Sequence, residues 1–353
     1  MSMAVARFDT AQPADVSGLA AALQSLGGAA NVEKAAVFLK VEGDYDDGAR
    51  EKARAALEAE VRSLGIGAYC QTLVAVGCEG VATPFGYLLA ERRDRAGARP
   101  AGASTARPGA SVARLAMGFA NGDIVPQDEL DSVSMADRVA ETVRAAMADA
   151  QLSVAEVAVC FVKLPAARAN GRGDENNERV RGRRTRAIGA LGAGIALGEI
   201  DRARVTEAAI VNDPSLHARR VQSFAGAEVT KIETIVLGNR PGAGGDLIAA
   251  SGLLTDLIDA QGLKRLMAGG REESDPGKLQ ALFIKAGAPP DGTVRGGRTT
   301  IFSSGVPPEK YMRAALSGLV AAVTGDTRAF ITGDPIQAAP EGGGSACVVL
   351  RVA

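Results

Sequence analysis

The chain has 353 residues and a formal net charge of −1; 46% of its residues are hydrophobic and only 4% are aromatic. This length suits two or three packed units, and the near-neutral charge argues against a nucleic-acid-binding protein. A single histidine, His217, excludes a site built from several histidines, so a buried lysine is the natural candidate for a catalytic base.

The sequence lacks the signals of a secreted or membrane protein. No apolar stretch reaches the roughly 18 residues that a membrane-spanning helix needs, and no signal-peptide pattern opens the chain. The four cysteines form no close pair, which argues against zinc. We therefore expect a cytoplasmic protein without a membrane or nucleic-acid partner.

One element recurs along the chain. A helical pattern beginning at Leu19 precedes the apolar run 35–40, another beginning at Val139 precedes 158–163, and a third beginning at Leu253 precedes 281–285. Continuous apolar runs of this length are typical of strands covered on both faces. The fold class expected is α/β in α+β layers: three like repeats, each a small sheet with flanking helices, around a pseudo-threefold axis.

The boundaries between repeats are partly visible in the composition. Residues 94–111 are rich in Pro, Gly, Ala and Ser and predict a linker, and a second boundary is expected within 240–252. The predicted units are 1–100 (unit A), 110–245 (unit B) and 250–353 (unit C). A polar loop is predicted over 167–184.

Each apolar run ends in a lysine: Lys40, Lys163 and Lys285. A single lysine at a strand end is best explained by its amine reaching solvent. Three at near-equal spacing favour a different interpretation, in which the amines meet at one axis and lower each other's pKa. A neutral lysine could then accept a proton from a serine hydroxyl.

Two glycine-rich segments have simpler alternatives to a ligand site. Residues 189–194 resemble a dinucleotide-binding loop, but no strand visibly precedes them, so a tightly packed helix is favoured. Residues 340–344 suit an anion or metal loop and equally an ordinary turn.

Several segments, in order, are similar to the cyanuric acid hydrolase and barbiturase family over nearly the full length. They are Gly77-Cys-Glu-Gly-Val-Ala-Thr-Pro, the segment from Thr185 to Ile200, Ile235-Val-Leu-Gly-Asn, Asp291-Gly-Thr-Val-Arg-Gly-Gly-Arg and Pro340-Glu-Gly-Gly-Gly. The resemblance implies hydrolysis of a small cyclic amide by a serine–lysine pair, usually that of the second repeat. It also implies a homotetramer.

The family's site residues carry over unevenly. Its lysines match Lys40, Lys163 and Lys285, but its three serines fall at Ala75, Phe224 and Thr332, with Ser223 one place before Phe224. The resemblance therefore implies Lys163 as general base and Ser223 as nucleophile, unless a water activated by Lys163 replaces it. The substrate-binding residues implied are Lys40, Lys52, Ala75, Val76, Arg186, Phe224, Lys285, Lys310, Thr332 and Gly333, of which Lys52, Arg186 and Lys310 stand at the family's arginine positions.

The resemblance also implies a metal site in unit C, while no cofactor is expected to be required. The family holds this metal through a glutamate, which is Gly287 here, and through a loop whose counterparts are Ala339, Pro340, Gly342, Gly343 and Gly344. A structural Mg²⁺ or Ca²⁺ is left open. The altered serines predict a less symmetric substrate than cyanuric acid. The alternatives are an inactive paralogue that binds a heterocycle or an active partner, and a different lysine-based reaction on the same scaffold.

Overall fold

Three four-stranded sheets with identical connectivity form the molecule. The computed structural model describes residues 1–43, 48–93, 112–126, 129–166, 175–269, 278–289, 291–300 and 308–352, without the side chains of 175–181, 308 and 310. The predicted linker 94–111 lies outside these residues. In each sheet the first strand of the unit pairs with the last, the last with the second and the second with the third.

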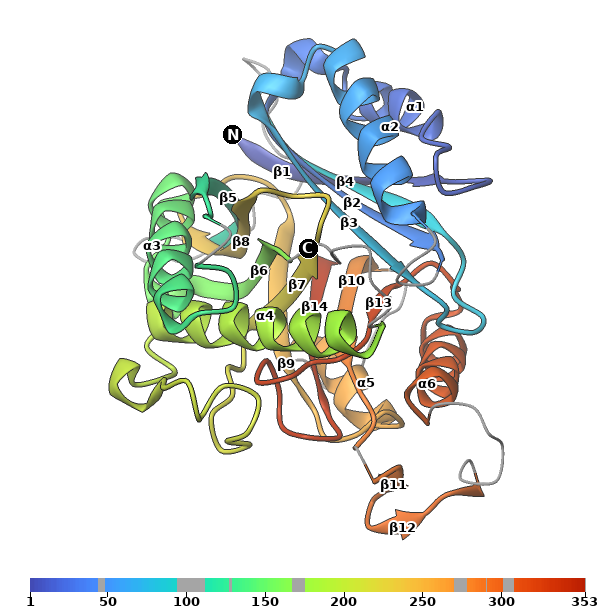
Figure 1. Ribbon diagram of the computed structural model, residues 1–353. Coiled ribbons are helices and arrows are strands. Elements are labelled where there is room, and N and C mark those ends of the chain that lie inside the picture. The colour runs from blue at the N-terminus through green and yellow to red at the C-terminus, as the bar shows by residue number, and fades with distance from the viewer. Residues whose placement is uncertain are drawn as a thin grey trace.

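Unit A supplies the sheet β1-β4-β2-β3 and two helices on its outer face (Figure 1). The elements are β1 (Ser2–Asp9), α1 (Gly18–Ser25), β2 (Val32–Glu42), α2 (Ala49–Ser63), β3 (Cys70–Gly77) and β4 (Phe85–Arg92). Strand β2 runs parallel to β3 and antiparallel to β4.

Units B and C repeat this arrangement as sheets β5-β8-β6-β7 and β9-β14-β10-β13. The elements of unit B are β5 (Ala113–Ile124), α3 (Val133–Ala150), β6 (Val157–Pro165), α4 (Glu175–Ala196), β7 (Val221–Gly226) and β8 (Lys231–Pro241). Those of unit C are β9 (Leu247–Leu254), α5 (Ala260–Ala268), β10 (Leu279–Ala286), the hairpin β11 (Thr293–Val294) and β12 (Gly297–Arg298), α6 (Pro308–Thr324), β13 (Phe330–Thr332) and β14 (Gly344–Arg351). Short 3-10 helices span Ala29–Asn31, Gly67–Tyr69, Val154–Glu156 and Arg202–Arg204.

The fold class is therefore the predicted one, with two local differences, at Leu253 and at residues 175–184. Leu253, predicted to begin a helix, lies near the end of strand β9, and α5 begins only at Ala260. Residues 175–184, predicted as part of a loop, are the first turns of α4. Residues 189–194 are helical, and a side chain at Gly192 would collide with the Ala136 carbonyl of α3. This glycine lets α4 and α3 pack closely. Strand β9 begins at Leu247, inside the expected boundary segment 240–252.

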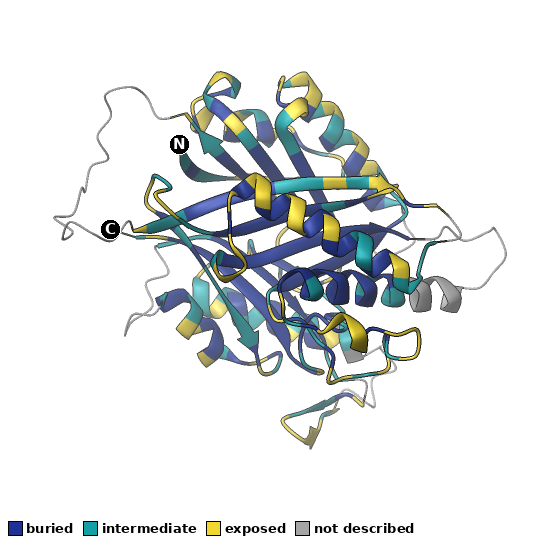
Figure 2. Ribbon diagram, turned by 90° about the vertical axis from the view of Figure 1, so that its left-hand side faces the viewer, coloured by how far each residue is buried: buried dark blue, intermediate teal, exposed yellow. Residues whose placement is uncertain are grey.

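Helix ends follow the local sequence. Helix α5 begins after Asp259, whose carboxylate accepts a hydrogen bond of 2.7 Å from the Gly262 amide. It ends at Gly269, where φ is +57°, a conformation that favours glycine. Helices in Figure 2 are buried toward the sheets and exposed outward, as amphipathic sequences require.

The inner faces of the three sheets meet in a shared central core. Its middle is a triangle of Phe38, Phe161 and Phe283, whose ring centroids are 4.8, 4.8 and 4.9 Å apart. Each phenylalanine stands two residues before a strand lysine. Because alternate residues of a strand share a face, the lysines also point toward the axis. The pseudo-threefold packing thus dictates where the lysines converge.

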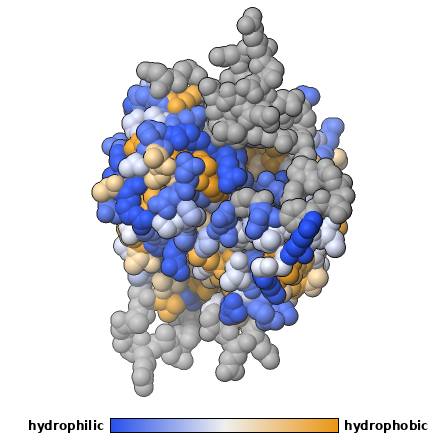
Figure 3. Space-filling model, turned by 60° about the horizontal axis from the view of Figure 1, so that its bottom comes forward, coloured by the Kyte–Doolittle hydropathy of each residue, from blue (hydrophilic) through white to orange (hydrophobic). Residues whose placement is uncertain are grey.

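The described surface carries few large apolar side chains. The face in Figure 3 shows small hydrophobic areas between hydrophilic residues. Among the helices of the described residues, none combines the length and apolar composition that crossing a membrane requires.

Candidate active site

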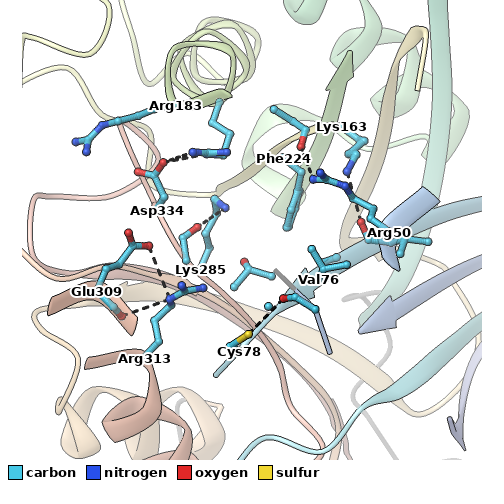
Figure 4. Close-up of a pocket in the computed structure, with 18 residues that line it drawn as sticks. Arg50, Val76, Cys78, Lys163, Arg183, Phe224, Lys285, Glu309, Arg313 and Asp334 are labelled. Atoms are coloured by element: carbon cyan, nitrogen blue, oxygen red, sulfur yellow. Dashed lines mark hydrogen bonds and ion pairs between the residues drawn. The ribbon is translucent and has the colours of Figure 1, made fainter. Parts of the chain in front are cut away.

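A cavity of about 310 Å³ lies at the axis, where the three units meet. It is lined by the ends of β3, β7 and β13, by two of the strand lysines and by the helix arginines that face them (Figure 4). Of the predicted site residues, the structure brings together Ala75, Val76, Lys163, Arg186, Phe224, Lys285, Thr332 and Gly333.

The strand register sets which residue stands beside each lysine. Lys40 is paired with Ala75 on β3, Lys163 with Phe224 on β7, and Lys285 with Thr332 on β13. All three lysines are at most 3% exposed, so none of the amines reaches solvent by extending from its strand. Burial of a charged amine has to be compensated by partners.

Two of the lysines have a buried glutamate as that partner. Lys40 Nζ lies 2.6 Å from Glu79 Oε2, and neither residue lines the cavity. Lys163 Nζ forms the equivalent ion pair with Glu228 and is 3.5 Å from the Val74 carbonyl of unit A. Both glutamates follow their strand in a Gly-x-Glu segment.

A glycine is required in that segment because the glutamate folds back over it. A Cβ built on Gly77 would overlap the Glu79 carboxylate, and one on Gly226 would overlap Glu228. The short turn therefore returns each carboxylate to the lysine of the same unit.

Each of the two glutamates also contacts an arginine from a neighbouring unit. Arg313 of α6 donates to Glu79 at 2.8 Å, and Arg50 of α2 lies 3.2 Å from Glu228. These contacts link unit C to unit A and unit A to unit B.

Arg186 of α4 completes the cycle by linking unit B to unit C. Its Nε donates to Asp334 at 3.0 Å. Burial alone would raise the pKa of Asp334, but Arg186 and Arg183 lower it, so its carboxylate stays charged.

Lys285 is held differently from the other two lysines. Its Nζ donates to the Gly333 carbonyl at 2.7 Å and lies 4.6 Å from the centroid of the Phe224 ring. Lys285 makes no ion pair with any residue that the structure describes. Figure 4 shows the Phe224 ring between Lys163 and Lys285.

Burial lowers the pKa of all three lysines, to different extents. Desolvation brings the pKa of Lys163 to about 8, against the opposing effect of Glu228. Desolvation and the nearby Arg186 bring the pKa of Lys285 to about 7. Of these two amines, Lys285 is therefore the closer to neutral at physiological pH. The pKa of Lys40 is also lowered by burial, and Glu79 opposes the shift.

The structure does not bring Ser223 to Lys163. The β6–β7 register runs unbroken from Cys160 opposite Val221 to Pro165 opposite Gly226, so no bulge turns Ser223 inward. Its side chain is fully buried against Gly189 of α4, on the face opposite Phe224. Among the described residues Ser223 Oγ has no hydrogen-bond partner.

At two of the predicted arginine positions, Lys52 and Lys310, the structure differs from the expectation. Lys52 is exposed on α2, whereas Arg50, two residues earlier, lines the cavity. The side chain of Lys310 lies outside the described residues, and Arg313 on the same helix lines the cavity. Sequence reasoning missed Arg50 and Arg313, as well as the acids they contact; the recurring Gly-x-Glu was the signal for two of those acids.

The metal implied by the resemblance does not fit the residues present. Gly287 stands at the position of the glutamate. A Cβ there would lie 2.5 Å from Pro335 Cδ, so there is no room for a side chain larger than that of glycine. The Gly287 amide instead donates to the Gly343 carbonyl at 3.1 Å. Within the described ranges no three His, Cys, Asp or Glu side chains form a metal-binding group.

Known proteins are similar to this chain in both sequence and architecture. A cyanuric acid amidohydrolase of Methylobacterium sp. (strain 4-46) is 31% identical over 98% of this chain and 96% of its own. A cyclic amide hydrolase of Azorhizobium caulinodans is 30% identical over 99% and 100%. A solved cyanuric acid hydrolase superposes with a TM-score of 0.86 at 27% identity, covering 99% of both chains.

A family sequence model described as amidohydrolase ring-opening protein matches residues 4–351. With the three equivalent units, the central cavity and these relatives, the match establishes that the chain belongs to the ring-opening amidohydrolases, hydrolases of C–N bonds in cyclic amides.

Proposed function

We propose that this protein opens a cyclic amide less symmetric than cyanuric acid, in the cavity between its three units. The observation that carries the proposal is the difference between the three positions beside the lysines, which hold a methyl group at Ala75, an aromatic ring at Phe224 and a hydroxyl at Thr332. A ring with three identical edges would meet three unlike walls.

The charges around the cavity favour an electron-rich ligand. Six basic and two acidic side chains line it, and such an excess attracts carbonyl oxygens or a deprotonated imide. The ring that fits best carries carbonyls toward Lys285 and Arg186 and a carbon edge toward Ala75 and Phe224. Cyclic imides and ureides with at least one ring CH₂ have this pattern.

Lys163 is proposed to bind a ring oxygen as an ammonium group. Glu228 contacts the Lys163 amine directly. The pKa of Lys163, about 8, keeps this amine protonated at neutral pH. A protonated amine donates to an oxygen that gains charge during attack on the carbonyl.

A substrate panel tests the proposal. Purified protein is incubated with cyanuric acid, barbiturate, dihydrouracil, glutarimide and hydantoin, and ring-opened products are detected by the mass of one added water. We expect at least one ring with a CH₂ edge to be opened faster than cyanuric acid. Failure on all five, or a preference for cyanuric acid, contradicts the proposal.

A matched variant tests the reason for the preference. Ala75→Ser combined with Phe224→Ser makes the three walls alike, so the rate ratio should move toward cyanuric acid by about tenfold or more, roughly the value of one hydrogen bond gained in a buried site. Lys52→Ser, on the exposed face of α2, is the control and should leave the ratio unchanged.

A further inference from the structure

Only one of the three positions beside the lysines carries a hydroxyl group. Thr332, paired with Lys285 across β10 and β13, is 5% exposed and lines the cavity. Its Oγ1 makes a long hydrogen bond of 3.4 Å to the Ile284 carbonyl. Ala75 and Phe224 have no nucleophilic atom, and Ser223 faces α4.

The lysine beside Thr332 is also the one without a carboxylate partner among the described residues. In units A and B the acid comes four residues after the position beside the lysine and folds back onto the amine. In unit C the acid, Asp334, comes two residues after Thr332, and its backbone is in the left-handed region with φ of +53°. It contacts Arg186 instead, which leaves the Lys285 amine facing the cavity.

From this juxtaposition, and resting on the proposed function, we propose that Thr332 and Lys285 of unit C form the nucleophile–base pair. Thr332 Oγ1 attacks the ring carbonyl carbon while its hydroxyl proton passes to Lys285 Nζ. The C–N bond then breaks, and Lys285 returns the proton to the leaving nitrogen.

A water completes the reaction. The opened ring is held as an ester on Thr332 until Lys285 accepts a proton from water, whose oxygen attacks the ester carbonyl. The bond to Oγ1 breaks, the proton passes to that oxygen, and a carboxylic acid leaves. The net change is one water added across one C–N bond.

The surroundings support these roles. Burial lowers the pKa of Lys285 to about 7, close to the value at which a base is most effective at neutral pH. Lys163 and Arg186, which line the same cavity, supply positive charge for the developing oxyanion. The Phe224 ring at 4.6 Å covers the amine and limits its hydration.

Covalent labelling tests the pair without a known substrate. The protein is treated with phenylmethanesulfonyl fluoride across pH 5–10, and the modified residue is located by peptide mass spectrometry. We expect wild type, Thr332→Ser and Ser223→Ala to be labelled at position 332, with a rate that rises through about pH 7, the pKa of Lys285. Thr332→Val, which keeps the shape without the hydroxyl, should not be labelled. Labelling elsewhere, or none at position 332, overturns the proposal.

Measuring the turnover of the same variants distinguishes a failure of this proposal from a failure of the proposed function. On whichever panel ring is opened, Thr332→Val and Lys285→Met should lose about 10²–10⁴-fold in kcat, as expected for a missing nucleophile or base, while Ser223→Ala retains full activity. A Thr332→Val enzyme as fast as wild type overturns the pair and leaves the proposed function standing. If wild type opens no ring, the proposed function fails, and the labelling alone decides the pair.

Discussion

Replacing Lys285 by methionine is expected to stabilise the protein at acidic and neutral pH while abolishing its activity. Burial lowers the pKa of Lys285 from its ordinary value of 10.5 to about 7. At about 1.4 kcal/mol per pKa unit, holding this amine protonated in the folded protein costs on the order of 5 kcal/mol. Methionine has a similar length and carries no charge to bury.

The cost depends on pH in a defined direction. Because the folded pKa lies below the unfolded one, the penalty is complete below about pH 7 and disappears as the pH rises from about 7 to 10.5. The variant also loses the hydrogen bond to the Gly333 carbonyl, worth about 1–3 kcal/mol for a charged donor. Lys285→Met should therefore be about 2–4 kcal/mol more stable than wild type at pH 6, and should lose this advantage by pH 10.5.

Urea unfolding at pH 6, 8 and 10 measures the difference. Lys52→Met, on the exposed face of α2, is the matched control and should show no such pH dependence. A Lys285→Met protein that is less stable than wild type at pH 6, or a difference that does not change with pH, refutes the reasoning.

Three further variants examine the surrounding network. Ser223→Ala removes a buried hydroxyl that lacks a partner among the described residues, so the melting temperature should stay constant or rise, as calorimetry will show. Glu228→Gln leaves Lys163 buried without its counter-charge and should cost about 3–5 kcal/mol of unfolding free energy in urea. Gly226→Ala should also destabilise, because the added Cβ displaces the Glu228 carboxylate. Its control, Gly318→Ala in α6, has open space around the new Cβ and should stabilise by up to about 1 kcal/mol; equal effects of the two alanines would contradict the role of Gly226.

The repeats and their lysines could be predicted because the strand pattern is local. An apolar run that contains a phenylalanine and ends in a lysine two residues later appears three times, and alternation along a strand places both side chains on one face. The same alternation explains why Ser223 could not be settled from sequence: a shift of one residue moves a side chain to the opposite face, and only the observed register excludes a bulge.

Arg50 and Arg313 could not be placed because the spacing between arginine and lysine is not repeated from unit to unit. On a helix, two residues differ by about 200° in direction, so Arg50 faces the cavity while Lys52 faces solvent. The contacts of Arg50, Arg186 and Arg313 cross between units. Contacts between distant parts of a chain leave no periodic trace in the sequence.

Because each unit contacts the next through an arginine, the site needs all three units together and belongs to no single one. Each unit gives an arginine to one neighbour and receives one from the other, which is the head-to-tail contact that closes a symmetric trimer. Removing one unit would leave one buried acid and one guanidinium, in the two units that remain, without their partners. A chain with its termini relocated to the junction near Leu247 keeps every one of these pairs. The site therefore depends less on the order in which the units are joined than on the presence of all three.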